Sequence, residues 1–214
     1  MTGPEPSPTG PAVAAVLWDA DGVLQDLPGG WVGAMGQIVS ERTEEFLRDA
    51  WCAERPTLAG DGDWPDLLGE VVARWGLQHA YDDILGVWSQ MEGSAESLAL
   101  VAQVRAAGLR CVLATNQDRH RARVMEARFD YGSRFDATYY SAQVGAAKPD
   151  HAYFRHVVDD LGLTPAEALL IDDNARNVEA ARHVGLRAVQ WTIGEGHEVL
   201  RGHLHRHAVL PASS

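Results

Sequence analysis

The sequence predicts an α/β fold, a doubly wound parallel sheet with a small helical unit inserted after its first strand. Two observations support this prediction. Beyond residue 93, short apolar runs alternate with helical segments, a pattern typical of parallel strands joined by helices. Between residues 25 and 91 the spacing is helical, and breakers such as Pro28-Gly29-Gly30 interrupt it. With 214 residues, the chain is long enough for one core domain and a modest insertion.

The chain divides into three predicted parts. Residues 1–11 include four prolines and no apolar periodicity, which indicates a disordered leader. Residues 12–24 and 92–214 form the predicted α/β core domain, and residues 25–91 form the helical unit. Five of the seven tryptophans lie in the helical unit. They could form an aromatic lid over a substrate, but a small helix bundle also needs large apolar residues for its own core, and we favour this second explanation.

The elements of the core domain follow from the apolar pattern. The first strand, residues 13–18, is a continuous apolar run that stops at Asp19, as expected for a buried parallel strand. Asn174 is placed to cap a helix that Gly185 ends, and Thr164-Pro165-Ala166-Glu167 has the form of a capping box. The other predicted elements are a helix up to Ala107, strands at 111–114, 137–140, 168–171 and 187–191, and helices at 119–128 and 149–161.

Charge and hydropathy exclude several classes of function. The formal net charge is −12, and no basic residue precedes Arg42 to begin a secretory signal, so we expect a cytoplasmic location. The longest early apolar stretch, residues 12–17, is far shorter than the roughly 20 residues that cross a bilayer. Binding to nucleic acid depends on basic side chains that neutralise phosphates. We therefore expect neither a membrane nor a nucleic acid as partner, while the oligomeric state stays open.

Polar residues gather where the predicted strands end, the edge at which parallel sheets bind ligands. Oxygen ligands without nearby Cys or His favour Mg²⁺ over Zn²⁺, and converging carboxylates need a cation among them. We therefore predict a magnesium site at this edge. The candidate residues are Asp19 and Asp21 after the first strand, Thr115 and Asn116 after the second, Lys148 before a helix, and Asp172 and Asp173 near the end.

These side chains suit transfer of a phosphoryl group. Asp19 can attack phosphorus, while Asp21 can protonate the departing oxygen and later activate water. Thr115 and Lys148 are suited to holding the phosphoryl oxygens. Lys148 is the one lysine among eighteen basic residues, which indicates a position that prefers a compact ammonium, although chance would also explain it.

The four motifs together resemble those of the haloacid dehalogenase superfamily. They stand here as Trp18-Asp19-Ala20-Asp21-Gly22-Val23, Ala114-Thr115-Asn116, Lys148-Pro149 and Ile171-Asp172-Asp173-Asn174. The resemblance implies a Rossmann-like core, with residues 25–91 as a helical cap that selects the substrate. The sequence near the fourth motif also resembles that of the glucose 1-phosphate phosphatases and of the phosphatase domain of soluble epoxide hydrolase.

The resemblance also implies a role for each residue. Asp19 would bind Mg²⁺ and act as nucleophile, and Asp21 would be acid and base while its backbone carbonyl contacts the metal. Asp173 would be the direct acidic ligand, and Asp172 would act through water or toward Lys148. The phosphate would be held by Thr115, Asn116 and Lys148. The expected reaction is Mg²⁺-dependent hydrolysis of a small phosphomonoester, with a sugar phosphate favoured.

Four other functions share part of this pattern. A dehalogenase would lack Asp21, and a signalling receiver would place its acidic pair after the first strand. A phosphoglucomutase-type enzyme keeps every catalytic residue present here, so it stays an alternative. A non-catalytic protein that binds a phosphorylated ligand is a weaker one, because it has no need of Asp21. His197, His203, His205 and His207 alternate with Arg near the end, which predicts an exposed helix rather than a metal site.

Overall fold

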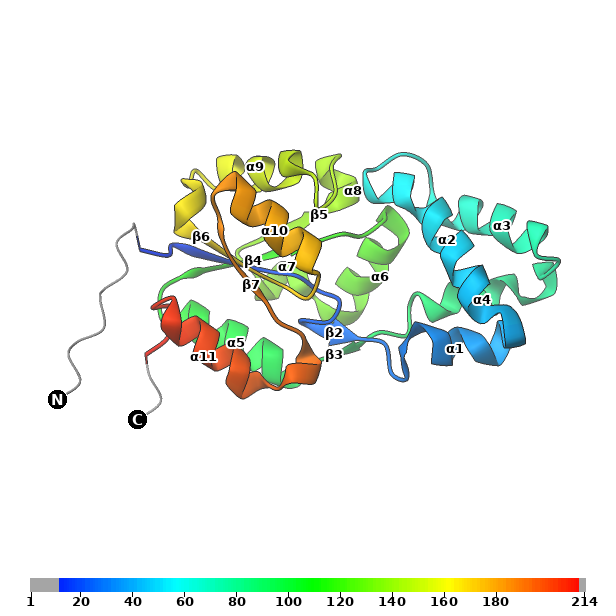
Figure 1. Ribbon diagram of the computed structural model, residues 1–214, viewed down its shortest axis with the longest axis horizontal. Coiled ribbons are helices and arrows are strands. Elements are labelled where there is room, and N and C mark those ends of the chain that lie inside the picture. Colours follow the sequence, from blue (N-terminus) through cyan, green and yellow to red (C-terminus); the bar gives the residue numbers. More distant parts are fainter. Residues whose placement is uncertain (1–11, 212–214) are drawn as a thin grey trace.

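The computed structural model describes residues 12–211, and its centre is a five-stranded sheet with the order β5-β4-β1-β6-β7 (Figure 1). Every neighbouring pair in this sheet is parallel. The predicted α/β fold with a parallel sheet is therefore confirmed, while the predicted leader, residues 1–11, lies outside the described residues. The strands are β1 (Ala15–Trp18), β4 (Arg110–Thr115), β5 (Ala137–Tyr140), β6 (Ala168–Asp172) and β7 (Arg187–Gln190).

Helices cover both faces of the sheet, which explains why the central strands are apolar throughout. In β1, Val16 and Trp18 pack into one hydrophobic cluster, and Ala15 and Leu17 pack into another on the opposite face. Helices α5, α6 and α11 lie on the first face, and α9 and α10 on the second (Figure 1). The helices of this part are α5 (Ala95–Ala106), α6 (Arg119–Phe129), α7 (Tyr131–Arg134), α8 (Ser141–Val144), α9 (His151–Asp160), α10 (Ala175–Val184) and α11 (His197–Arg206).

Local sequence signals begin and end several of these helices. Asn174 accepts a hydrogen bond from Arg176 N at the start of α10, and Gly185 ends that helix in the left-handed conformation, as predicted. The capping box at Thr164 is also present, but it begins only the 3₁₀ turn η3 (Pro165–Glu167). The turn cannot extend because β6 begins at Ala168.

The helical unit, which contains helices α1–α4, has a hydrophobic cluster of its own. Trp64 and Trp88 are buried in it, together with Phe46 and Met35, while Trp51 is exposed. Most of its aromatic surface therefore serves internal packing, as the second explanation supposed. The elements are α1 (Gly30–Val39), η1 (Ser40–Arg42), α2 (Thr43–Leu58), α3 (Trp64–Arg74), η2 (Gln78–Ala80) and α4 (Tyr81–Val87).

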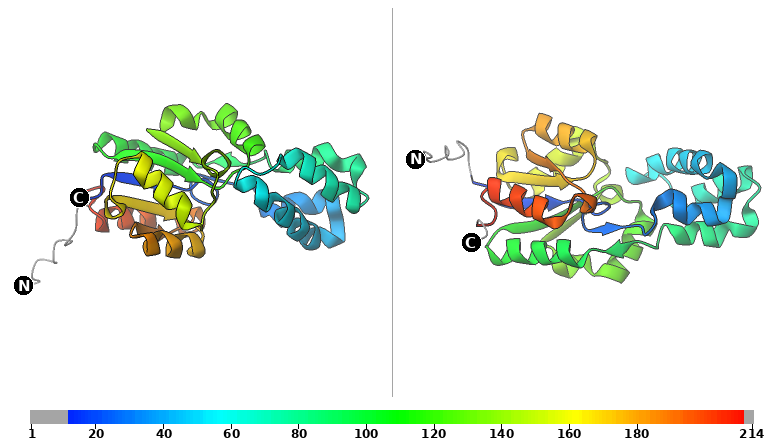
Figure 2. Two further views of the ribbon diagram at one scale, coloured as in Figure 1. Left: turned by 90° about the horizontal axis from the view of Figure 1, so that it is seen from above. Right: turned by 60° about the horizontal axis from the view of Figure 1, so that its bottom comes forward.

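Two linkers join the helical unit to the sheet. They pair as a two-stranded antiparallel ladder, β2 (Gln25–Asp26) with β3 (Glu92–Gly93). The helical unit stands beyond the carboxyl ends of the parallel strands (Figures 1 and 2), with α2 packed against α8 and α3 against α6. Whatever binds at that edge of the sheet is therefore close to the helical unit.

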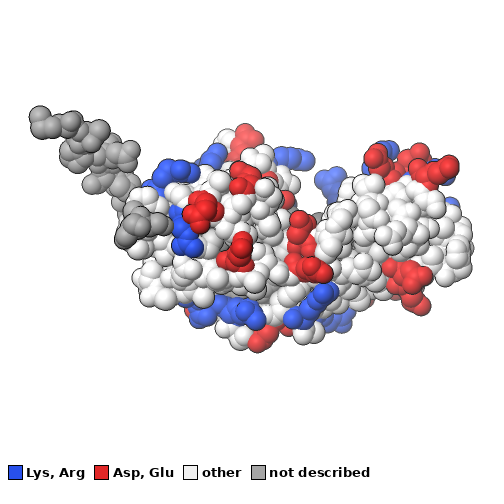
Figure 3. All heavy atoms as spheres, turned by 90° about the horizontal axis from the view of Figure 1, so that it is seen from below, with Lys and Arg blue, Asp and Glu red and all other residues white. Residues whose placement is uncertain are grey.

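Two surface features bear on possible partners. Between residues 12 and 211, no helix is both long and apolar enough to cross a bilayer. On the face drawn in Figure 3, acidic side chains are interspersed with basic ones, and that face has no continuous basic surface.

Candidate active site

The sheet brings most of the candidate residues together at one edge. Asp19 directly follows β1, Thr115 is the last residue of β4, and Asp172 is the last residue of β6. Because β1 pairs in parallel with both β4 and β6, these three strand ends are adjacent. Asp19 N donates to Ile171 O at 2.9 Å, which fixes the loop after β1 beside β6. Lys148 joins them from the loop between α8 and α9.

Lys148 lies at the centre of this group and is buried. Its Nζ lies 2.9 Å from Asp19 Oδ1 and 2.6 Å from Asp172 Oδ2, and it donates to Ala114 O at 2.9 Å. Burial opposes the charge of the ammonium, but Asp172 and Asp19 outweigh it, so the pKa of Lys148 is raised. Lys148 is therefore a fixed positive charge between two carboxylates.

Asp19 is a buried carboxylate that is only partly compensated. Its Oδ1 accepts a hydrogen bond from Ala20 N at 2.8 Å in addition to the contact with Lys148. Burial raises the pKa of Asp19 to about 8, with Lys148 opposing the rise and Asp172 and Asp21 adding to it. One ammonium is thus too little positive charge for this group of carboxylates.

Three of the carboxylates are arranged as a metal ion would need them. Asp19, Asp172 and Asp173 each offer an oxygen, and these oxygens lie within 4.8 Å of one another. Burial and the charge of Asp172 raise the pKa of Asp173 to about 6. An all-oxygen donor set with excess negative charge fits Mg²⁺, whose binding would favour the ionised carboxylates.

Gly22 gives Asp173 the space it occupies. A Cβ atom at Gly22 would lie 2.7 Å from Asp173 Oδ2. The backbone angle φ of Gly22 is 73°, a value that residues other than glycine rarely adopt. A larger residue in the loop after β1 would therefore displace an oxygen of the candidate metal group.

Thr115 and Asn116 differ in what their side chains contact. Thr115 is buried, and its Oγ1 accepts a hydrogen bond from Gln117 Nε2 at 3.2 Å. Asn116 Nδ2 donates to Lys148 O at 2.7 Å, and Asn116 Oδ1 accepts from Lys148 N at 2.9 Å. The Asn116 amide thus holds the backbone of Lys148, a positioning contact that the sequence did not indicate.

Asp172 is surrounded by donors. Besides Lys148, it accepts hydrogen bonds from Asn174 N at 2.9 Å and from Asn177 Nδ2 at 3.0 Å and 3.2 Å. Asn177 lies in the first turn of α10, so the start of that helix orients the carboxylate. Asp172 therefore contacts Lys148 directly, one of the two arrangements expected for it.

Asp21 points to a different set of partners. Its carboxylate accepts hydrogen bonds from Gln25 Nε2 at 2.7 Å, Arg121 Nη2 at 2.9 Å and Gln117 Nε2 at 3.1 Å. Sequence reasoning missed all three donors. Gln117 and Arg121 lie in the loop after β4 and in the first turn of α6, so they are close to the carboxyl edge of the sheet. Their position after a predicted strand could have identified them as candidates.

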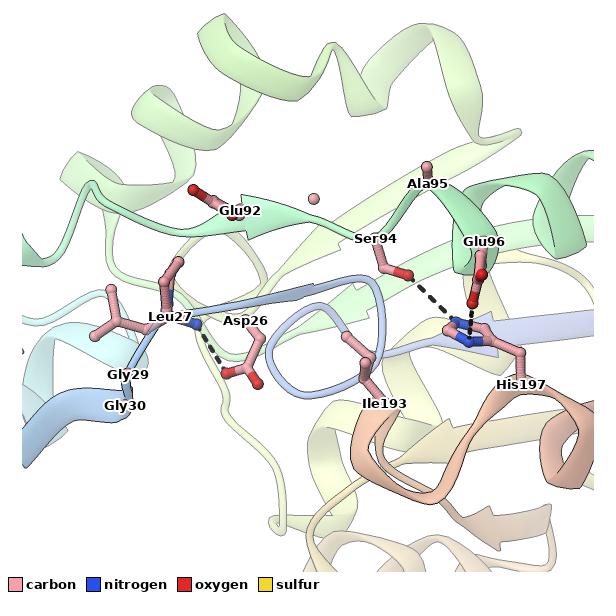
Figure 4. A pocket seen from close by; sticks show the side chains of 12 residues that line it. Asp26, Leu27, Gly29, Gly30, Glu92, Ser94, Ala95, Glu96, Ile193 and His197 are labelled. Carbon is pink, nitrogen blue, oxygen red and sulfur yellow. Dashed lines mark hydrogen bonds and ion pairs between the residues drawn. The ribbon is translucent and has the colours of Figure 1, made fainter. Parts of the chain in front are cut away.

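The histidine-containing segment is not part of this site. It forms α11, whose Leu200 and Leu204 are buried against the sheet, so only the polar side of the predicted exposed helix faces solvent. Its first residue, His197, lies at a cavity of about 590 Å³ beside the linkers, 3.2 Å from Ser94 Oγ and 2.7 Å from Glu96 Oε2 (Figure 4). Within the described part of the chain, Asp19, Asp172 and Asp173 form the one group of three or more His, Cys, Asp or Glu side chains placed closely enough to share a metal ion.

Comparisons with known proteins point to hydrolases. The haloacid dehalogenase-like hydrolase family matches residues 13–185. The chain is 31% identical over 101 residues to the sesquiterpene phosphatase astK of Aspergillus oryzae, which is 46% of this chain and 50% of that protein. It is 24% identical over 187 residues to a phosphorylated carbohydrates phosphatase of Thermotoga maritima, 84% of this chain and 85% of that one.

The extent of these matches differs. The shorter curated matches span between 12% and 50% of the relative's own length. Among solved structures, a HAD family enzyme of Bacteroides thetaiotaomicron in complex with magnesium and inorganic phosphate has a TM-score of 0.74 and 21% identity, covering 88% of this chain and 99% of that one. At this identity, the structural likeness concerns the fold.

Proposed function

The chain belongs to the haloacid dehalogenase-like hydrolases, and from this premise we propose that it is a Mg²⁺-dependent phosphatase of small phosphomonoesters that acts through an aspartyl-phosphate intermediate. The observation that carries the proposal is the group of Asp19, Lys148 and Asp172, in which a buried ammonium lies 2.9 Å and 2.6 Å from two carboxylates. Asp173 brings a third carboxylate to the group, and Asp21 follows Asp19 by two residues.

The first half-reaction forms the intermediate. A carboxylate oxygen of Asp19 attacks phosphorus, the bond from phosphorus to the leaving oxygen breaks, and that oxygen takes a proton from Asp21. Lys148 and Thr115 would hold the phosphoryl oxygens in place. Asp19 and Asp173 would hold Mg²⁺, with Asp172 beside them, and the ion would supply positive charge to the phosphoryl oxygens during transfer.

The second half-reaction releases phosphate. Water attacks phosphorus of the aspartyl phosphate, its proton passes to the Asp21 carboxylate, and the bond between phosphorus and the Asp19 oxygen breaks. Asp19 is then restored as a carboxylate beside Lys148. The buried position of Asp19 supports this scheme, because the intermediate forms where bulk water has limited access.

The helical unit is the proposed cap, and the proposed substrate is a sugar phosphate. Arg119 Nη1 donates to Gly60 O at 2.9 Å, and Arg128 Nη1 donates to Ser89 O at 2.6 Å, so α6 joins the sheet to the helical unit. The phosphorylated carbohydrates phosphatase matches most of the chain, which supports the sugar class. The similarity to a sesquiterpene phosphatase supports a second substrate class, terpenyl phosphates, which should be tested beside the sugar phosphates.

The deciding experiment compares wild type with Asp19→Asn for release of inorganic phosphate. The panel contains p-nitrophenyl phosphate, sugar phosphates and a terpenyl monophosphate, each with Mg²⁺ and with EDTA. We expect Mg²⁺-dependent release that falls by at least about 10³-fold in Asp19→Asn, because the nucleophile is lost.

Asp159→Asn is the matched control, since it makes the same change at an exposed position of α9. It should retain wild-type release. Substantial Mg²⁺-dependent activity in Asp19→Asn would contradict the assignment of the nucleophile. Free phosphate as the product would also separate a phosphatase from the phosphoglucomutase-type alternative.

A further inference from the structure

The Asp21 carboxylate is held by donors from three different parts of the chain. Gln25 in β2 and Arg121 in α6 both donate to Oδ1, at 2.7 Å and 2.9 Å, and Gln117 donates to Oδ2 at 3.1 Å. All three are side-chain donors, and both oxygens act as acceptors. A carboxyl group with donors on both oxygens is held in one orientation.

The two glutamines are themselves fixed by the core. Tyr131 OH donates to Gln25 Oε1 at 3.1 Å. Gln117 Nε2 also lies 3.2 Å from Thr115 Oγ1, and Gln117 N donates to Ser141 Oγ at 3.0 Å. The amide groups are therefore set by the sheet and its loops, independently of the helical unit.

Arg121 is different, because it reaches both the core and the helical unit. Its side chain is 7% exposed, and its guanidinium carbon lies over the ring of Trp31 in α1, 5.4 Å from the ring centroid. Asp118 Oδ1 accepts from Arg121 N at 3.1 Å and fixes the first turn of α6. Arg121 is thus a buried cation that holds Asp21 on one side and packs against the proposed cap on the other.

We propose that Arg121 is a positioning residue for the second half-reaction, orienting the Asp21 carboxylate to take the proton from the water that attacks the aspartyl phosphate. This inference rests on the proposed phosphatase function. In that step the bond between water oxygen and phosphorus forms, the bond between phosphorus and Asp19 breaks, and the proton goes from water to Asp21. Arg121 would act through its hydrogen bond to Asp21 Oδ1 and would not itself take or give the proton.

The proposal predicts a specific split in the kinetics. With p-nitrophenyl phosphate, the leaving phenolate needs little help from an acid, so kcat/KM reports formation of the intermediate with little contribution from Asp21. Breakdown of the intermediate limits kcat when water is poorly activated. Arg121→Gln should therefore lower kcat by about 10²-fold and leave kcat/KM within about 3-fold of wild type.

The test is steady-state and rapid-mixing kinetics of the full chain with p-nitrophenyl phosphate and Mg²⁺. In Arg121→Gln, the initial burst of p-nitrophenol should rise toward one per active site, because the intermediate accumulates. Arg121→Lys keeps the positive charge and should restore part of kcat. The matched control is Arg123→Gln, the same change at an exposed position of α6, which should retain wild-type kcat and burst.

The outcomes separate the two proposals. If wild type releases no phosphate from any monoester, the proposed function is wrong. If wild type turns over but kcat and kcat/KM of Arg121→Gln fall together, or neither falls, then Arg121 is not a positioning residue for the second step. Should Arg121→Gln fail to fold by circular dichroism, the same split measured in Arg121→Lys, smaller but in the same direction, decides the question.

Discussion

Lys148 Nζ has three acceptors, Asp19 Oδ1, Asp172 Oδ2 and Ala114 O, at 2.9 Å, 2.6 Å and 2.9 Å. An ammonium is compact and can turn its three donors toward separate acceptors, whereas a guanidinium is planar and larger. The side chain is fully buried, so the carboxylates cannot move apart without repacking the strand ends. This geometry accounts for a lysine at this position in a chain whose other basic residues are arginines.

We therefore predict that Lys148→Arg lowers kcat by at least about 10²-fold, although the charge is retained, because the guanidinium cannot occupy the same site. Phosphate release at saturating Mg²⁺ measures the loss, and circular dichroism checks the fold. Arg155→Lys, an exposed change on α9 in the opposite direction, is the control. Unchanged kinetics of Lys148→Arg would show that the compact ammonium is not required.

At the residue scale, the site side chains that directly follow a strand could be predicted from the sequence, whereas the contacts that position them could not. Asp19, Thr115 and Asp172 stand where an apolar run ends, a signal present in the chain itself. The positioning contact of Asn116 with Lys148 joins residues 32 apart, and that of Arg121 with Asp21 joins residues 100 apart. The position of Arg121 just after a strand is visible in the sequence, but the partner that each of these side chains contacts depends on tertiary packing.

At the element scale, helix α2 carries a buried carboxylate that affects stability. Burial is the main cause that raises the pKa of Glu54 from 4.5 to about 7, with Arg121 opposing it and Asp118 adding to it. Trp88 Nε1 donates to Glu54 Oε1 at 3.0 Å. Because the folded state holds the proton more tightly than the unfolded chain, this group stabilises the fold in acid. That contribution is lost as the pH rises through about 7.

Glu54→Gln should therefore make the free energy of unfolding less dependent on pH. The amide can still accept from Trp88, and at about pH 8 the variant should be more stable than wild type by at most about 3 kcal/mol. Urea unfolding at several pH values measures this difference. Glu44→Gln, an exposed change on the same helix, should follow wild type, and a Glu54→Gln curve parallel to wild type would contradict the assigned pKa.

The strands of the main sheet and the longer helices could be predicted from the sequence, whereas the linker strands and the shortest helices could not. The predicted helix at 119–128 and the strand at 137–140 correspond to α6 and β5. The linkers β2 and β3 have two residues each, and the helices α7 and α8 have four residues each, about one helical turn, so neither kind of element repeats an apolar period. Their positions depend on the packing of the larger elements around them.

At the scale of the whole molecule, binding at the strand ends should stabilise the chain. Mg²⁺ with inorganic phosphate at about 100 times its dissociation constant would add about 2.7 kcal/mol to the folded state. For a chain of this size, that corresponds to a rise in Tm of roughly 5–10 °C. Differential scanning calorimetry measures the shift. Asp173→Asn should abolish most of it, and the absence of any shift in wild type would show that these carboxylates do not hold the ion.

The parallel class of the sheet could be predicted at this scale, but its strand order could not. Alternating apolar runs and helices imply parallel strands with right-handed connections. They do not fix which strand is central, since that depends on where each crossover returns. The order places β1 in the middle, between β4 and β6. That central place brings the loops after three strands to one site.

The buried position of Lys148 makes the reactivity of its amine a measure of how often the core opens. It is the only side-chain amine of the chain, and none of that side chain is exposed in the folded state. Acylating reagents that attack side-chain amines should reach it only in molecules whose strand ends have come apart. The fraction of chains acylated at this one position, read by mass spectrometry, would therefore count how often the core opens.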